Sequence, residues 1–179
     1  TALNTCMEMI DKLRDTAQSH DRCSVVEVMG RRAGYLALNV GIACGATSII
    51  VPEIPFDFEK DIIERMFATS ATGKKHFIII VAEGVGHVIE MSEKIQARTG
   101  IETRATILGH VQRGGSPSLR DRVLASEMGY HAVLLLLDGK SNRVVTIQND
   151  HILDYDIEEA LQMKKPFDFE LYRMAHEIS

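Results

Sequence analysis

Cysteine is scarce in this sequence, which has only Cys6, Cys23 and Cys44. These three form no closely spaced pair and their number is odd, which argues against a disulfide framework and against a CxxC zinc site. Long apolar runs are also lacking, since a strongly apolar run such as 132–137 is far too short to cross a bilayer. We therefore expect a cytoplasmic protein with reduced thiols, no metal site of its own and no membrane partner.

Positive charge is in deficit as well. Twenty Lys and Arg residues face 25 Asp and Glu residues, and the formal net charge is -5. This balance argues against general attraction to nucleic acid, although a local basic pocket could still hold a phosphate ester. The first residues also lack the basic segment followed by an apolar segment that is typical of a secretory signal. Because the chain starts at Thr1 and enters a helical pattern directly, we expect a truncated or processed start.

Strands and helices are predicted to alternate along the chain. Leu3, Met7, Ile10 and Leu13 have helical spacing, and apolar β-branched runs predict strands. The expected strands are 24–29, 48–51, 77–81, 103–108 and 143–148, and the expected helices are 33–44 ending at Gly45, 57–71 capped by Asp57, 87–98 closed by Gly100, one ending at Leu137 and two short ones near the C-terminus. Because parallel crossovers need a bridging helix, this order predicts an α/β fold, with a Rossmann-like parallel sheet covered by helices on both faces.

Polar and glycine residues follow several of the predicted strands. They are Met29-Gly30-Arg31, Glu83-Gly84 and the turn-rich segment 109–115. Ligands of open α/β sheets bind beyond the carboxyl ends of the strands, where glycine permits close backbone approach and arginine offers forked donors to phosphate. A single arginine there is more often a solvated residue, and a Gly-Gly pair is usually a turn. Their clustering favours a site for a phosphorylated polyol.

Three stretches closely resemble motifs of the bacterial 6-phosphofructokinases. They are Val26–Arg31, Glu102–Arg104 and Leu108–Pro117, the last followed by Asp121-Arg122. The third motif is long and unusual in composition, and the similarity extends across the whole chain. The resemblance implies a phosphofructokinase fold and a cytoplasmic homotetramer of glycolysis. The intact enzyme would use ATP with Mg²⁺ to convert fructose 6-phosphate to fructose 1,6-bisphosphate.

The resemblance also implies a set of substrate-binding residues. Arg31 would contact the sugar phosphate and stabilise charge on the phosphoryl group in transfer, and Glu83 would hold sugar hydroxyls. The full set comprises Met29, Gly30, Arg31, Glu83, His110 and Arg113 within one subunit, and Arg22 and Arg104 reaching into the site of a neighbouring subunit.

Part of the family's effector site is matched too. The matching residues are Arg14, Gly45, Thr47, Lys74, Lys75 and His76. Thr47 and, approximately, Thr72 align with a metal-binding glutamate and a cation that are common at this site. We therefore expect a weak response to ADP and phosphoenolpyruvate. The alternative for Lys74-Lys75 is a solvated turn after a helix, where cations complement the helix dipole.

The family's catalytic aspartate and glycine-rich nucleotide loops lie upstream of the stretch that Thr1 begins. We therefore expect a fragment without activity and without bound Mg²⁺ or ATP. Residues 1–111 and 164–179 would form the sugar-phosphate domain, and residues 112–163 would complete the nucleotide domain of the intact enzyme. A pyrophosphate-dependent phosphofructokinase and a non-catalytic sugar-phosphate-binding module are the alternatives. An unrelated periplasmic-type binding protein is disfavoured by the missing signal.

Overall fold

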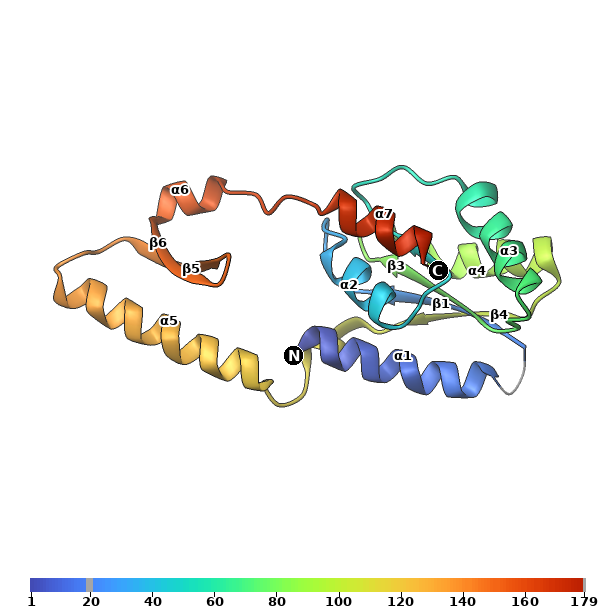
Figure 1. The fold of residues 1–179 in the computed structure, drawn as a ribbon, viewed down its shortest axis with the longest axis horizontal. Coiled ribbons are helices and arrows are strands. Elements are labelled where there is room, and N and C mark those ends of the chain that lie inside the picture. The colour runs from blue at the N-terminus through green and yellow to red at the C-terminus, as the bar shows by residue number, and fades with distance from the viewer. Residues whose placement is uncertain (19–20, 179) are drawn as a thin grey trace. The chain divides into compact units, whose positions relative to one another are not determined.

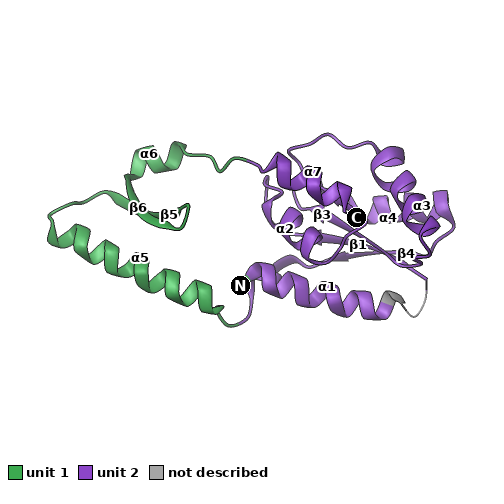
Figure 2. Cartoon of the chain, in the orientation of Figure 1, with its two compact units in different colours: residues 1, 116–166 green, residues 2–115, 167–179 purple. Residues whose placement is uncertain are grey.

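The structure is a computed structural model that describes residues 1–18 and 21–178. It divides into two compact units, which Figure 2 shows in separate colours. The larger unit comprises residues 2–115 and 167–179, and the smaller unit comprises Thr1 and residues 116–166. Each unit is a separate body with its own strands.

Helices and strands alternate through the larger unit, as the sequence predicts (Figure 1). Their bounds are α1 (Ala2–Gln18), β1 (Cys23–Val28), α2 (Tyr35–Ala43), β2 (Ser48–Ile50), the π-helical η1 (Glu59–Glu64), α3 (Arg65–Ala71), β3 (Phe77–Ala82), α4 (Val88–Thr99), β4 (Thr103–Ile107), the 3-10 helix η2 (Gly109–Arg113) and α7 (Phe169–Glu177). The turn-rich segment after β4 thus contains a short helix that the sequence analysis did not predict.

The strands of the larger unit form one parallel sheet in the order β2-β3-β1-β4. The central strand β1 pairs with β3 from Cys23 opposite Phe77 to Val28 opposite Ala82. Its other side pairs with β4 over five residues of the same strand. The predicted α/β fold with a parallel sheet is confirmed.

Each face of the sheet carries its own hydrophobic core. Val26 and Val28 of β1 pack with buried side chains of α1, α2 and α7, such as Leu38. Val25 packs on the other face with residues of η1, α3 and α4, such as Ile95. Burying a large aliphatic side chain contributes about 1.5–3 kcal/mol, so these two layers hold the helices onto the sheet.

Three predicted helix ends are confirmed. Gly45, which follows α2, has φ +58°, and Gly100, which follows α4, has φ +74°. Both values lie in the left-handed region that glycine enters at low cost. At the start of the helical run before η1, the Asp57 carboxylate accepts a hydrogen bond from the Lys60 N–H at 2.9 Å.

The smaller unit contains a β-hairpin that the sequence analysis only half predicted. Its elements are α5 (Leu119–Leu137), β5 (Arg143–Gln148), β6 (His151–Asp156) and α6 (Ile157–Gln162). The strand at 143–148 is confirmed, and the two helical segments expected after it are present as α6 and α7, but the sequence analysis did not predict β6, which pairs antiparallel with β5. Asn149 and Asp150 join the strands with φ values of 51° and 61°. Two left-handed residues match a type I′ hairpin turn, so this Asn-Asp pair was the missed signal.

Apolar side chains of the smaller unit are widely exposed. On α5, Leu119 is 79% exposed, Leu136 is 70% and Leu137 is 77%, and on α6 Leu161 reaches 81%. Exposed apolar side chains that gather on one unit typically mark a contact surface. Among the described residues, no helix has both the length and the apolar character needed to span a membrane.

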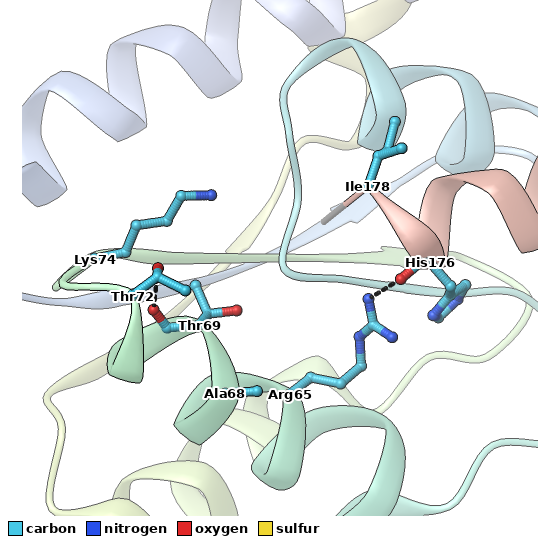
Figure 3. Close-up of a pocket in the computed structure, with 7 residues that line it drawn as sticks. All are labelled: Arg65, Ala68, Thr69, Thr72, Lys74, His176 and Ile178. Atoms are coloured by element: carbon cyan, nitrogen blue, oxygen red, sulfur yellow. Dashed lines mark hydrogen bonds between the residues drawn. The ribbon is translucent and has the colours of Figure 1, made fainter.

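Helix α7 is joined to the larger unit by hydrogen bonds to backbone carbonyls. Arg65 donates from Nε to the Thr47 carbonyl and from a terminal nitrogen to the His176 carbonyl, each at 3.0 Å, and the second bond is drawn in Figure 3. Tyr172 donates its hydroxyl to the Ile49 carbonyl at 3.2 Å. The Arg65 guanidinium therefore joins α3, the segment before β2 and the end of α7.

We predict that Arg65→Met lowers the free energy of unfolding of the larger unit by about 2 kcal/mol, because two carbonyl groups lose a charged donor. Arg65→Lys should recover little of this, since an ammonium cannot span both carbonyls as the planar guanidinium does. Urea unfolding and hydrogen exchange of the α7 amides measure the effect. Arg173→Met, which removes a 76%-exposed arginine of α7, is the control that should change nothing. Equal stability of the Arg65 and Arg173 variants would contradict the role of Arg65.

Candidate functional site

The segments that follow β1, β3 and β4 meet at one edge of the sheet. The parallel register sets the end of β1 beside the end of β3, with Val28 opposite Ala82, and β4 ends on the other side of β1. Residues 29–31, Glu83 and residues 109–115 therefore leave the sheet at its carboxyl edge. This is the edge at which the sequence analysis expected a ligand site.

Glu83 links the loop after β1 to the end of β3. Its Oε2 atom accepts hydrogen bonds from the backbone N–H groups of Arg31 at 2.9 Å and Gly30 at 3.1 Å. These two donors hold the pKa of the Glu83 carboxyl below its usual value, and the charges of Arg31 and His110 act in the same direction. Glu83 is therefore ionised at neutral pH. Burial, and next the charge of Glu83, raise the pKa of the nearby Glu27, a residue that the sequence analysis did not single out.

The loop after β1 has a backbone conformation that depends on its glycine neighbours. Arg31 has φ +53°, in the left-handed region that costs a non-glycine residue roughly 1–2 kcal/mol. A Cβ atom on Gly30 would lie 2.4 Å from the Ala33 carbonyl oxygen, and one on Gly84 would lie 2.5 Å from the Arg31 carbonyl oxygen. Both contacts are with backbone, which cannot swing away. Gly30 and Gly84 therefore permit the close packing that holds Arg31 in this conformation.

The helix η2 carries two predicted site residues outward and one unpredicted residue inward. His110 and Arg113 are exposed and lie three residues apart, one turn of a 3-10 helix, so they share a face. Gln112 is only 1% exposed, and its Oε1 atom accepts a hydrogen bond from the Met29 N–H at 2.8 Å. The sequence analysis included Gln112 in the motif without a role, because its partner lies far away in the sequence.

Arg22 and Arg104 lie at the opposite edge of the sheet. Both pair with Glu102: Arg22 through Nε at 2.8 Å and Arg104 through a terminal nitrogen at 2.8 Å. Arg22, and then Arg104, lower the pKa of the Glu102 carboxyl. Since Arg22 precedes and Met29 follows a strand of six residues, about 20 Å of β1 separates the two groups. Within one chain, these arginines do not join the group formed by Arg31, Glu83 and His110.

Five of the six residues predicted to bind an effector line one cavity of about 260 Å³. Its walls come from α1, the end of α2, the approach to β2 and the approach to β3. The lining consists of Arg14, Cys44, Gly45, Thr47, Lys74, His76 and Ile78. Arg14 donates a hydrogen bond to the Cys44 carbonyl. Lys75 is not part of this lining; its side chain is 74% exposed and lies 3.8 Å from Asp21.

A second cavity of about 440 Å³ shares Lys74 with the first one. Figure 3 shows Lys74, Thr72 and Thr69 approaching it from one side and Arg65, His176 and Ile178 from the other. The Thr72 hydroxyl donates to the Thr69 carbonyl at 2.7 Å. Thr72 lines this second cavity and not the first one. The sequence analysis did not predict that Arg65 and His176 would line a cavity. Burial, with the charge of Arg65, lowers the pKa of His176.

The described residues do not form a metal site. No group of three or more His, Cys, Asp or Glu side chains in residues 1–18 and 21–178 could hold a metal ion.

Comparison with known proteins identifies the family. The family model described as phosphofructokinase matches residues 1–136. Proteins named ATP-dependent 6-phosphofructokinase from Brevibacillus brevis and Bacillus cytotoxicus are 56% and 54% identical, and one named ATP-dependent 6-phosphofructokinase 1 from Clostridium perfringens is 55% identical. Each alignment covers 100% of this chain and 56% of the relative, so the chain spans about half the length of these relatives.

Solved structures agree with this result. The phosphofructokinase of Saccharomyces cerevisiae has a TM-score of 0.84 and 32% identity, over 90% of this chain and 23% of that one. The T-state phosphofructokinase of Pichia pastoris has a TM-score of 0.79 and 32% identity, over 90% and 20% of the two chains. A pyrophosphate-dependent enzyme from Marinobacter aquaeolei shares the fold, with a TM-score of 0.77 and 23% identity over 94% and 47% of the two chains. The chain belongs to the phosphofructokinase family.

Proposed function

We propose that this chain is the sugar-phosphate-binding portion of an ATP-dependent 6-phosphofructokinase of glycolysis. The intact enzyme transfers the terminal phosphoryl group of ATP to fructose 6-phosphate. One observation carries the proposal: an ionised Glu83 shares the carboxyl edge of the sheet with the cationic Arg31 and with His110. A phosphorylated sugar has hydroxyl donors for the carboxylate and phosphate oxygens for the cations. The names of the bacterial relatives support ATP as the donor.

Each residue at this edge has a distinct task in the proposal. His110 and Arg113 bind the phosphate of fructose 6-phosphate, and Met29 and Gly30 line the sugar. Glu83 accepts hydrogen bonds from sugar hydroxyls. Arg31 contacts the sugar phosphate and also stabilises charge on the phosphoryl group during transfer, so it acts in the transition state as well as in the ground state.

The proton acceptor and the Mg-ATP site belong to other parts of the intact enzyme in this proposal. The attack of the sugar hydroxyl on the terminal phosphate depends mainly on positioning and on charge stabilisation. Mg-ATP, when bound there, supplies the phosphoryl group and neutralises its charge. The residues of this chain hold and orient the acceptor sugar.

The intact protein would be a cytoplasmic homotetramer. Arg22 and Arg104 would then bind the phosphate of a sugar held by a neighbouring subunit. Their position supports this assignment, because about 20 Å of strand separates them from the site of their own chain. Glu102 would preorganise both arginines through its ion pairs at 2.8 Å.

Residues 112–163 would complete the nucleotide-binding domain of the intact enzyme. The exposed leucines of α5 and α6, which reach 79% and 81% exposure at Leu119 and Leu161, support this assignment. A surface of this kind gains stability when a partner layer covers it.

The cavity around Arg14 and Lys74 would bind a phosphorylated effector such as ADP or phosphoenolpyruvate. Its lining contains two cations and no carboxylate, which favours an anion. The threonines at 47 and 72 stand where the family often has charged residues, so this site would respond weakly.

Experiments can separate two alternative functions from the proposed one. A pyrophosphate-dependent enzyme would use pyrophosphate in place of ATP; the Marinobacter aquaeolei structure shares the fold of this chain, and a shared fold does not distinguish the two donors. A non-catalytic module would bind fructose 6-phosphate without turnover. Assays of the full-length protein with each donor, beside direct binding of fructose 6-phosphate, separate all three.

We predict that the 179-residue chain alone forms no fructose 1,6-bisphosphate from Mg-ATP and fructose 6-phosphate. Lack of a positioned proton acceptor typically costs about 100- to 10,000-fold in rate. The full-length protein, assayed in parallel, is the positive control. Turnover by the short chain near that of the full-length protein would overturn the prediction.

We predict that Arg104→Ser and Arg31→Ser fail differently in the full-length enzyme. Arg104→Ser should mainly raise KM for fructose 6-phosphate, because uniform binding is lost. Arg31→Ser should also lower kcat by about 100-fold or more, since a charge-stabilising donor is removed. Arg98→Ser, which removes a 55%-exposed arginine paired with Glu59, is the matched control.

Mixing the two variants tests the cross-subunit assignment. A hybrid tetramer contains some sites with Arg31 from one subunit and Arg104 from its neighbour, so activity at low fructose 6-phosphate should reappear. Verified subunit exchange without recovery of activity would show that Arg104 serves its own subunit.

We predict a weak response of the full-length enzyme to ADP and phosphoenolpyruvate, because Thr47 and Thr72 carry no charge. Activity at subsaturating fructose 6-phosphate should change by less than about twofold, since neutral hydroxyls form weaker hydrogen bonds to a phosphorylated effector than charged groups do. Lys74→Ala should abolish the residual response. A sharp, several-fold response in the parent protein would show that the cavity works without these charges.

A further inference from the structure

Gln112 occupies a position where an apolar side chain would be expected on grounds of stability. It is one of the large side chains that are almost fully buried, with 1% exposure. Its Nε2 atom is buried and makes no hydrogen bond to any other described residue. A buried amide with an unused donor destabilises a fold relative to a methionine or leucine of similar size. Packing alone does not account for a glutamine here.

The hydrogen bond from the Met29 N–H to Gln112 Oε1 gives the glutamine a specific task. Met29 is the first residue after β1, and its N–H donates to the side chain of Gln112. The next two N–H groups, on Gly30 and Arg31, donate to Glu83. Three successive N–H groups are thus held by two side chains that come from different elements.

We propose that Gln112 is a positioning residue that joins the loop after β1 to η2. Its hydrogen bond fixes the positions of the proposed sugar-binding loop and of the proposed phosphate-binding helix relative to each other. This inference rests on the proposed function. Glu83 holds Gly30 and Arg31 from the β3 side, and Gln112 holds Met29 from the η2 side. Because His110 and Arg113 flank Gln112 on the same short helix, the amide fixes the backbone of Met29 relative to the two proposed phosphate-binding side chains. Gln112 itself touches no substrate.

The test uses the full-length enzyme with Gln112→Met, which keeps the length of the side chain and removes the acceptor. Loss of one positioning hydrogen bond should raise KM and the dissociation constant for fructose 6-phosphate by about 10-fold, and it should lower kcat. The KM for ATP should stay within about twofold, because the donor site is not held by this amide. Hydrogen exchange at the Met29 amide should become faster in the same variant.

Two further variants separate positioning from stability. Gln112→Asn keeps an amide that is one methylene too short to reach Met29, and it should raise KM for fructose 6-phosphate in the same direction. Ile95→Val removes one methylene from the core on the other side of the sheet, and it should lower the unfolding temperature without changing KM. A merely structural role of Gln112 would give the result of Ile95→Val.

The measurements distinguish a failure of this inference from a failure of the proposed function. Unchanged KM for fructose 6-phosphate in a folded Gln112→Met or Gln112→Asn enzyme overturns the inference, as does unchanged exchange at Met29. A parent enzyme that neither binds nor phosphorylates fructose 6-phosphate overturns the proposed function instead, and the exchange of the Met29 amide still decides whether Gln112 holds the loop.

Discussion

The parallel pairing of β1 with two neighbouring strands is the constraint on which the arrangement of charged residues depends. β1 is hydrogen-bonded to β3 on one side and to β4 on the other. Parallel strands point the same way, so the segments that enter them gather at one edge and those that leave them gather at the other. Arg22, Glu102 and Arg104 are thereby grouped at the amino edge, while Arg31, Glu83 and His110 are grouped at the carboxyl edge.

Much of this arrangement could be predicted from local sequence signals. Continuous β-branched runs and helix-ending glycines such as Gly45 and Gly100 act over a few residues, and both signals gave correct elements. β6 was missed because the Asn149-Asp150 turn was not used as a hairpin signal. Gln112 could not be assigned a role, because its partner Met29 is 83 residues away and only the fold brings them together.

The carboxyl edge combines backbone strain with electrostatic compensation. Arg31 is held in a left-handed conformation, and the ionised Glu83 offsets part of that cost through two hydrogen bonds from the same loop. The glycines at 30 and 84 cannot be replaced without a backbone collision. The loop is therefore set before a ligand arrives, which reduces the ordering that binding must impose.

Through its hydrogen bond with Arg65, helix α7 also supports the wall of the smaller cavity. Arg65 holds the carbonyl of Thr47, which belongs to the wall of the smaller cavity, and also holds the carbonyl of His176 in α7. Deletion of Phe169 and the residues after it would remove α7 but no residue of the sheet or of its carboxyl edge. It would nevertheless remove one support of the arginine that braces the cavity wall. Protease nicking or a bulky fusion near α7 would thus loosen the two cavities that Lys74 lines before it disturbed the carboxyl edge of the sheet.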